Sequence, residues 1–301
     1  MTTITGRTKV RFWSNGEECA AWHYPGKNGA CIVMAGGLGV TKEPATDRFA
    51  PRFQEAGFSV LAFDFRYLGE SGGKPRQFVS IDKQLADWRA AIDFASTLPE
   101  VDPAKTAIWG FSLSGGYVLR LSARDHRIAA AVAVAPLVDG PASGRIAMRR
   151  GDTNLSEIRG LTWRAFKDAG GALFGRDPQL VALNGEPGSA SALTSPDARN
   201  GNAALNPDNR YPEWRQEVSA RSALTTVLFR PASKVTGIRC PLLVVAFDDD
   251  GVAYAEPAVR AAHRAPRGEL VRLPGGHYAA VLDQYEPAVE AQVKFLRQHL
   301  V

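Results

Sequence analysis

Hydrophobic and polar positions follow two patterns along this chain, short apolar runs and helical periodicity, which predict strands and helices in alternation. Short apolar runs typical of buried strands occur at Ala30–Ala35, Ser59–Phe63, Thr106–Trp109, Ile128–Val134, Leu242–Ala246 and Glu269–Leu273. Stretches with helical periodicity separate them, near Thr46–Ala56, Ser80–Ser96, from Leu113, near Glu256–His263 and near Glu286–His299. Strands and helices in regular alternation predict a parallel sheet flanked by helices.

The start and the middle of the chain depart from this alternation. Strand-like stretches on either side of Asn15-Gly16 predict an antiparallel hairpin. Over 139–236 the pattern changes to helical fragments and to a stretch rich in Gly, Pro, Asn, Ser and Asp. A long irregular insertion in a compact domain usually has a function. We therefore predict one α/β core, formed by residues 1–138 and 237–301, which is interrupted by an inserted helical lid or cap at 139–236.

The run T-A-I-W-G-F-S-L-S-G-G, residues 106–116, leads from a buried strand into a helix. A nucleophilic serine at such a turn has a strained backbone, and the residues two before and two after it must be small. Around Ser112 these residues are Gly110 and Ser114, a near match to G-x-S-x-G. Ser114 is an alternative nucleophile, because Gly116 lies two residues after it. We favour Ser112 because it lies closer to the end of the strand.

A serine hydroxyl becomes a good nucleophile only when a base takes its proton, so the chain should supply a histidine near the same sheet edge. His277 follows the last predicted strand on the loop P-G-G-H-Y-A, where the glycines give it freedom to reach a serine. The other four histidines lie in the hairpin or in or beside helices, at His23, His126, His263 and His299. We predict His277 as the base.

The base in turn needs an acid that orients it. The strand before the last one leads into F-D-D-D-G-V, so three acids follow it directly. Asp250 fits best because it lies several residues beyond the strand and before a turn at Gly251. Asp248 and Asp249 remain alternatives.

An acyl-enzyme mechanism also needs backbone N–H groups at the developing oxyanion. Leu113, at the start of the helix after the nucleophile, is predicted to supply one. The early segment I-V-M-A-G-G-L-G-V is predicted to supply the other from Leu38, since Gly36 and Gly37 allow a close approach. An ordinary glycine turn is the alternative interpretation of this segment.

With these motifs the chain resembles the α/β-hydrolase superfamily over its whole length. The matching segments are Cys31–Val40, Val60–Gly73, Thr106–Leu119, Pro241–Gly251 and Leu273–Ala279. F-D-F-R-Y-L-G-E-S-G-G is similar to a segment of lysophospholipase-like and dienelactone-hydrolase-like members. W-R-Q-E-V-S-A-R-S-A-L before I-R-C-P is similar to polyketide-processing esterases and acyltransferases. The chain departs from the family pattern at Gly36-Gly37, where many members have His-Gly, and at Ser114 in the elbow.

Composition and spacing limit the partners and cofactors that we expect. The chain has 301 residues, of which 45% are hydrophobic and 22% charged, as in soluble globular proteins. Its net charge of +5 is spread along the chain, which argues against a nucleic-acid partner. Cys19, Cys31 and Cys240 lack metal or redox spacing, and we expect buried free thiols. No phosphate loop, dinucleotide fingerprint or metal-ligand spacing is present, so no cofactor or metal is expected.

The first ten residues lack the features of a signal peptide, and no apolar run is long enough to span a membrane. A cytoplasmic location is therefore the default expectation.

The expected function is a serine hydrolase that cleaves a small-molecule carboxylic ester or thioester. Acyl transfer to an alcohol or amine by the same residues is one alternative, and a non-catalytic ligand-binding homologue is another. In the insertion, seven large side chains are expected either to line an acyl pocket or to form the core of the lid. They are Trp163, Phe166, Leu173, Phe174, Tyr211, Trp214 and Phe229.

Overall fold

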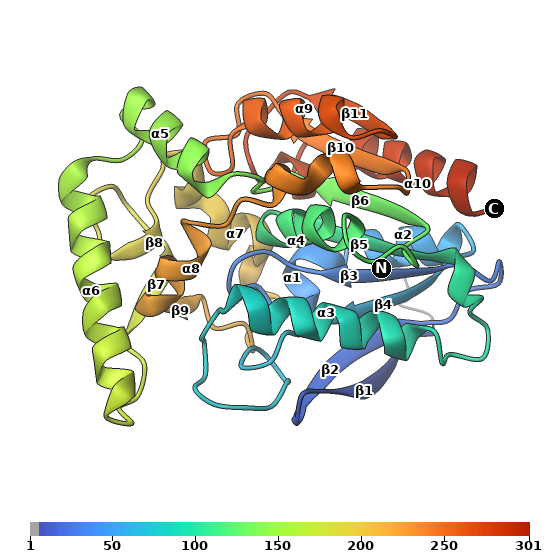
Figure 1. Ribbon diagram of the computed structural model, residues 1–301, viewed down its shortest axis with the longest axis horizontal. Helices are drawn as coiled ribbons and strands as arrows, with labels where there is room; N and C mark the ends of the chain where they lie inside the picture. Colours follow the sequence, from blue (N-terminus) through green and yellow to red (C-terminus); the bar gives the residue numbers. More distant parts are fainter. Residues whose placement is uncertain (1–5) are drawn as a thin grey trace.

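A computed structural model describes residues 6–301 (Figure 1), so residues 1–5 of the segment considered above for a signal peptide lie outside the described residues. Its main feature is an eight-stranded sheet. In spatial order the strands are β1 (Thr8–Ser14), β2 (Glu17–Tyr24), β4 (Ser59–Phe63), β3 (Cys31–Ala35), β5 (Thr106–Phe111), β6 (Ala130–Val134), β10 (Leu242–Phe247) and β11 (Gly268–Leu273). The strands from β4 to β11 are parallel, and β1 and β2 form the expected antiparallel hairpin at one edge.

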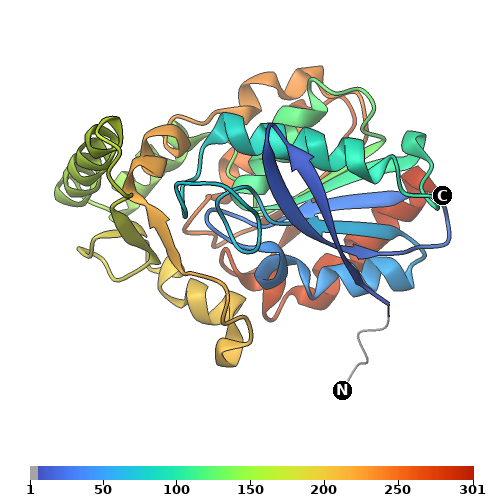
Figure 2. The ribbon, with the colours of Figure 1, turned by 90° about the horizontal axis from the view of Figure 1, so that it is seen from below.

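Helices cover both faces of this sheet, as Figure 2 shows. One layer contains α3 (Ile81–Ala95), α4 (Leu113–Ser122) and α9 (Ala255–Arg264), and the other contains α1 (Lys42–Thr46), α2 (Phe49–Glu55) and α10 (Tyr285–Leu300). Two short 3₁₀ helices, η1 (Pro103–Lys105) and η6 (Ala279–Val281), complete the core. The predicted alternation of strands and helices is present, although the helix expected over 46–56 begins earlier and is divided into α1 and α2.

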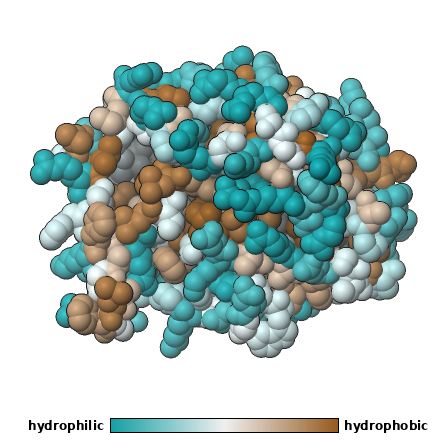
Figure 3. Space-filling view, in the orientation of Figure 1, coloured by the Kyte–Doolittle hydropathy of each residue, from teal (hydrophilic) through white to brown (hydrophobic). Residues whose placement is uncertain are grey.

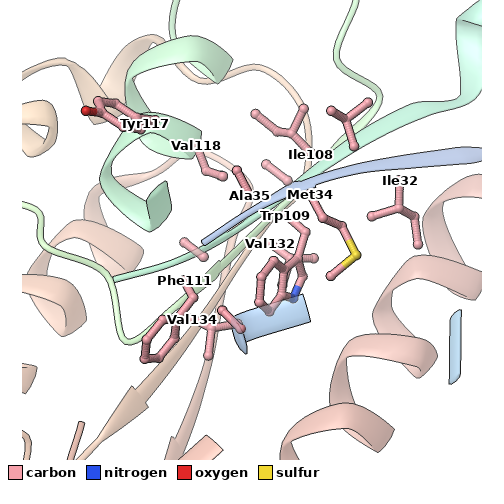
Figure 4. Close-up of a cluster of buried hydrophobic side chains, with 14 of the residues drawn as sticks. Ile32, Met34, Ala35, Ile108, Trp109, Phe111, Tyr117, Val118, Val132 and Val134 are labelled. Carbon is pink, nitrogen blue, oxygen red and sulfur yellow. The ribbon is translucent and has the colours of Figure 1, made fainter. Parts of the chain in front are cut away.

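The central strands β3, β4, β5 and β6 are buried on both faces, which explains their continuous apolar runs. Figure 4 shows side chains of β3, β5 and β6 packed together, with Trp109 among them. The Trp109 indole donates a hydrogen bond to Gln292 Oε1 of α10 over 2.6 Å, so its polar atom is satisfied inside the core. Each fully buried large side chain of this kind contributes about 1.5–3 kcal/mol, and together they fix the strand ends that carry the site.

The 139–236 segment lies beyond the carboxyl ends of the parallel strands, at the left in Figure 1. Its helices are α5 (Gly140–Arg150), α6 (Leu155–Leu173), α7 (Gly201–Leu205) and α8 (Ala223–Thr226), with 3₁₀ turns η2 (Asp197–Asn200), η3 (Pro207–Asn209), η4 (Ala220–Ser222) and η5 (Pro231–Gly237). It also contains a three-stranded sheet in the order β8 (Ser191–Leu193), β7 (Leu180–Asn184) and β9 (Glu217–Ser219). The prediction of helical fragments was therefore incomplete. The sheet was missed because its strands are very short and β7 pairs with the distant β9, which leaves no local hairpin signal.

None of the helices within residues 6–301 has both the length and the apolar character needed to cross a membrane.

Candidate active site

Ser112 lies at the turn between β5 and α4, with a strained backbone at φ 57° and ψ −117°. Neighbouring strands and loops hold it there: its N–H donates to the Val134 carbonyl over 2.9 Å, and its own carbonyl accepts from the Leu137 N–H over 3.0 Å. A Cβ atom added at Gly110 would lie only 2.3 Å from the Ser114 carbonyl oxygen. The close chain crossing expected at this elbow is therefore present, and it requires glycine at position 110.

His277 and Asp250 lie beside Ser112 in one continuous chain of contacts. Ser112 Oγ is 2.9 Å from His277 Nε2, and His277 Nδ1 is 2.9 Å from Asp250 Oδ2. The side chains of His277 and Asp250 are only 1% and 2% exposed. The second Asp250 oxygen accepts the backbone N–H groups of Val252 and Ala253, both over 2.8 Å. This arrangement fixes a carboxylate, an imidazole and a hydroxyl in a line.

The acid in this line is held in its charged form. Burial raises the pKa of Asp250, but the charge of His277, its hydrogen bond and the two backbone N–H bonds outweigh burial and lower that pKa below its ordinary value. A buried carboxylate that stays ionised can orient the imidazole and stabilise the positive charge that forms when the imidazole takes a proton.

The two other acids of the D-D-D run lie elsewhere. Asp248 pairs with Arg272 on the surface at 2.7 Å. Asp249 accepts only a long hydrogen bond, 3.4 Å, from the Gly275 N–H. The structure thus brings Asp250, and neither of its neighbours, against His277.

The two predicted oxyanion residues flank the serine. Leu38 and Leu113 both line the same cavity as Ser112. An added Cβ at Gly37 would lie 3.0 Å from Ser112 Cβ, so the loop before Leu38 passes directly over the serine. Leu113 begins α4, and the first N–H groups of a helix have no acceptor within it.

Two side chains hold the loop of residues 36–39, the glycine loop, in place. The Ser114 hydroxyl is fully buried and donates to the Gly36 carbonyl. The Trp214 indole donates to the Gly39 carbonyl over 2.9 Å. The departure from glycine at position 114 therefore has a structural reason, and Ser114 does not contact the histidine.

A buried ionic cluster anchors α1, which follows the loop, and no sequence motif predicts it. Lys42, with a side chain only 1% exposed, lies 3.0 Å from Asp64, 2.9 Å from Glu43 and 2.7 Å from Glu70. Burial raises the pKa of Asp64 to about 6 in spite of Lys42, whereas hydrogen bonds from Lys42 and Lys9 outweigh burial and lower the pKa of Glu70 to about 2. The F-D-F-R-Y-L-G-E segment signalled family resemblance but gave no reason to connect it with this lysine.

Ser112 opens into a cavity of about 420 Å³ between the sheet edge and the 139–236 segment. Much of its lining is apolar and includes Leu38, Leu137, Leu161, Val181, Leu193 and Val218. Such a cavity suits an apolar group attached to the carbon that Ser112 would attack.

The seven large side chains proposed from sequence do not line this cavity. Trp214 and Phe229 are buried, against the glycine loop and against Tyr117 respectively. Tyr211 is partly buried against the core. The remaining four lie on the outer face of α6 or at its C-cap, with side chains that are 61–86% accessible: Trp163, Phe166, Leu173 and Phe174.

Helix geometry explains this result. Leu161 and Ala165 are four residues apart, so they share the face that lines the cavity, and Trp163 and Phe166 fall on the far side. Figure 3 shows the resulting apolar surface at the left end of the molecule, over α6. For these four residues both interpretations, pocket lining and internal core, were wrong.

The cysteines are buried free thiols, as expected. Within residues 6–301 no group of three or more His, Cys, Asp or Glu side chains could hold a metal ion.

Comparisons with known proteins agree with this architecture. The family model described as alpha/beta hydrolase family matches residues 32–291. The quorum-quenching protein AidA of Acinetobacter baumannii is 36% identical over 96% of this chain and 94% of its own length. The thiohydrolase aneE of Aspergillus aculeatus is 39% identical over a shorter stretch, 37% of this chain and 35% of its own.

The crystal structure of the alpha/beta hydrolase GrgF from a Penicillium species has a TM-score of 0.80 to this chain, at 24% identity, and covers 98% of this chain and 99% of its own. In sequence, the curated polyketide transferase grgF is 30% identical over 61% of this chain and 59% of its own length. The structural likeness confirms the predicted fold.

Proposed function

Because the chain belongs to the alpha/beta hydrolase family, we propose that it is a serine hydrolase that cleaves a carboxylic ester or thioester through an acyl-enzyme on Ser112. One observation carries the proposal. The contacts from Asp250 to His277 and from His277 to Ser112, each 2.9 Å, end at a hydroxyl that opens into an apolar cavity. A protein that only binds a ligand needs no such line of acid, base and strained serine.

The geometry supports the following steps. His277, with its Nδ1 proton donated to Asp250, accepts the Ser112 proton on Nε2 as Ser112 Oγ bonds to the substrate carbonyl carbon. The carbonyl oxygen becomes an oxyanion, which accepts hydrogen bonds from the N–H groups of Leu113 and Leu38. The intermediate collapses, the bond to the alcohol or thiol breaks, and His277 returns the proton to that leaving group.

Water then repeats the sequence on the acyl-enzyme. His277 takes a proton from water, the hydroxide oxygen bonds to the acyl carbon, and Ser112 leaves with the proton restored. The products are a carboxylic acid and a regenerated enzyme. Each step uses the same base and the same oxyanion donors.

The cavity indicates the class of acyl group. Its aliphatic walls favour an apolar acyl chain, and each buried methylene of that chain contributes about 0.8 kcal/mol. Most of these walls come from the 139–236 segment, which we propose acts as a lid that covers the small-molecule substrate and sets specificity.

A panel of p-nitrophenyl esters of increasing acyl length tests this proposal. We expect kcat/KM to rise with chain length until the cavity is filled, and kcat to fall by about 10⁴–10⁶-fold in Ser112→Ala. A response that is independent of chain length and unchanged in Ser112→Ala would contradict the esterase assignment. Absence of turnover of any ester or thioester would favour the non-catalytic alternative.

Acyl transfer is the second candidate, and the relative named polyketide transferase favours keeping it. The same acyl-enzyme would be attacked by an alcohol or amine in place of water. Product analysis with and without a candidate acceptor separates the two. A transferred acyl product that dominates over free acid at modest acceptor concentration would assign the protein as a transferase.

A further inference from the structure

One carboxylate of the 139–236 segment reaches the backbone of both loops that carry the acid and the base. Asp197 begins the 3₁₀ turn η2. Its Oδ2 atom accepts the N–H of His277 over 2.5 Å and the N–H of Gly251 over 3.1 Å. Gly251 follows Asp250 directly, so a single oxygen atom links the base loop to the acid loop.

Two glycines beside the triad leave the room that Asp197 occupies. A Cβ added at Gly276 would lie 2.5 Å from Asp197 Oδ1, and one added at Gly251 would lie 3.1 Å from Asp197 Cβ. Neither glycine has a positive φ, so neither needs glycine for its own backbone conformation. The close approach of Asp197 is therefore the reason for glycine at position 276, where the sequence suggested only loop freedom.

A second set of contacts ties the residue after the base to the same segment. The Tyr278 hydroxyl donates to Asn184 Oδ1 over 3.2 Å, and Asn184 Nδ2 donates to Asn202 Oδ1 over 2.7 Å. Both asparagines belong to the 139–236 segment. The base loop is thus held by this segment at two consecutive residues.

From these contacts we infer that Asp197 is a positioning residue for the triad, and that the 139–236 segment completes the active site rather than only covering it. The inference rests on the proposed serine-hydrolase function. A charged acceptor forms stronger hydrogen bonds than a neutral one. The Asp197 oxygen accepts from the N–H of the base itself and from the N–H of Gly251, the residue after the acid. Without this oxygen, the acid and base loops remain joined near their strands, where the Asp249 N–H donates to the Gly275 carbonyl over 3.0 Å. The His277 N–H then loses its acceptor, and the His277 ring is held less firmly between Asp250 and Ser112.

Three variants test this role. Asp197→Ala removes the acceptor, Asp197→Asn keeps an amide oxygen that can accept the same N–H groups, and Asp177→Ala is a matched control at an exposed aspartate of the same segment. We expect kcat to fall about 100-fold in Asp197→Ala, since a small misplacement of catalytic groups has that effect. KM should change little because Asp197 does not line the cavity. Asp197→Asn should recover most of kcat, and Asp177→Ala should match the wild type.

A readout that needs no substrate accompanies the kinetics. The proton between His277 Nδ1 and Asp250 should give a low-field ¹H NMR signal, which we expect to be lost or shifted in Asp197→Ala and kept in Asp197→Asn. If the wild type hydrolyses no ester, the proposed function fails, and this signal still decides the positioning role.

The inference is overturned if Asp197→Ala keeps both the signal and a kcat within about threefold of the wild type. It is also overturned if kcat falls equally in Asp197→Ala and Asp197→Asn, or only in proportion to the loss of folded protein measured by thermal unfolding.

Discussion

The core and the 139–236 segment meet at the same cavity but differ in how their residues are placed. In the core, Ser112, Asp250 and His277 each follow a parallel strand, and such strands deliver their carboxyl ends to one edge of the sheet. In the segment, α6 has apolar residues on two faces, and only packing decides that Leu161 lies inside and Trp163 outside. The comparison indicates that sheet topology places the chemistry, whereas the shape of the cavity depends on contacts that arise only in three dimensions.

The largest expected effect is the loss of the base. His277→Ala should lower kcat by about 10⁴–10⁶-fold, because among residues 6–301 His277 is the base that contacts the Ser112 hydroxyl. His263→Ala, at an exposed histidine of α9, should behave as the wild type. Steady-state kinetics on a p-nitrophenyl ester measures both. Similar rates in the two variants would remove His277 from the mechanism.

Loss of the acid is expected to have the second-largest effect. Asp250→Asn should lower kcat by about 10³–10⁴-fold, since the amide no longer holds the imidazole in the productive tautomer. Asp248→Asn, which breaks only the surface pair with Arg272, should lower it less than about twofold. If Asp248→Asn loses activity and Asp250→Asn keeps it, the acid has been assigned to the wrong residue of the D-D-D run.

A smaller effect tests the two faces of α6. Leu161→Trp fills part of the cavity, so kcat/KM for the longest accepted ester should fall about 10–100-fold while short esters are little affected. Trp163→Leu, on the outer face, should leave the chain-length profile unchanged. A profile altered by Trp163→Leu but not by Leu161→Trp would mean that α6 presents its other face to the substrate.

The smallest effect is on stability and concerns the ionic cluster below the glycine loop. The Lys42 and Lys9 hydrogen bonds outweigh burial and lower the pKa of Glu70 to about 2, from 4.5, so this carboxylate stabilises the folded state above pH 4.5. That stability should disappear as the pH falls from 4.5 towards 2. Glu70→Gln should therefore lower Tm by about 2 °C at pH 7.

Thermal unfolding of both proteins at pH 7 and near pH 2 checks this sign. The Tm difference should be largest at pH 7 and close to zero at the acid end. A difference that grows as the pH falls would show that Glu70 is not stabilised in its charged form.

Much of the core could be predicted from sequence because its signals are local. The buried strands read as continuous apolar runs, and the elbow motif and the D-D-D-G loop each follow one of them. The G-G-H loop follows β11, a partly exposed strand at the edge of the sheet. The order of the strands brings the three motifs together, and that order follows from the family pattern.

The parts that sequence did not predict depend on residues far apart in the chain. Asp197 contacts His277 across 80 positions, and Trp214 reaches Gly39 across 175. Ser114 was weighed as a rival nucleophile, yet its hydroxyl fastens the Gly36 carbonyl. In each case a side chain donates to or accepts from a backbone group that only the folded arrangement brings near.

Labelling with a fluorophosphonate probe, followed by mass spectrometry of the modified peptide, tests the central claim most directly. The probe reacts covalently with a serine that a neighbouring base activates. The wild type and Ser114→Ala should both carry the label on Ser112, and Ser112→Ala should carry none. Labelling of Ser112→Ala at the wild-type rate would contradict the assignment of the nucleophile and, with it, the mechanism.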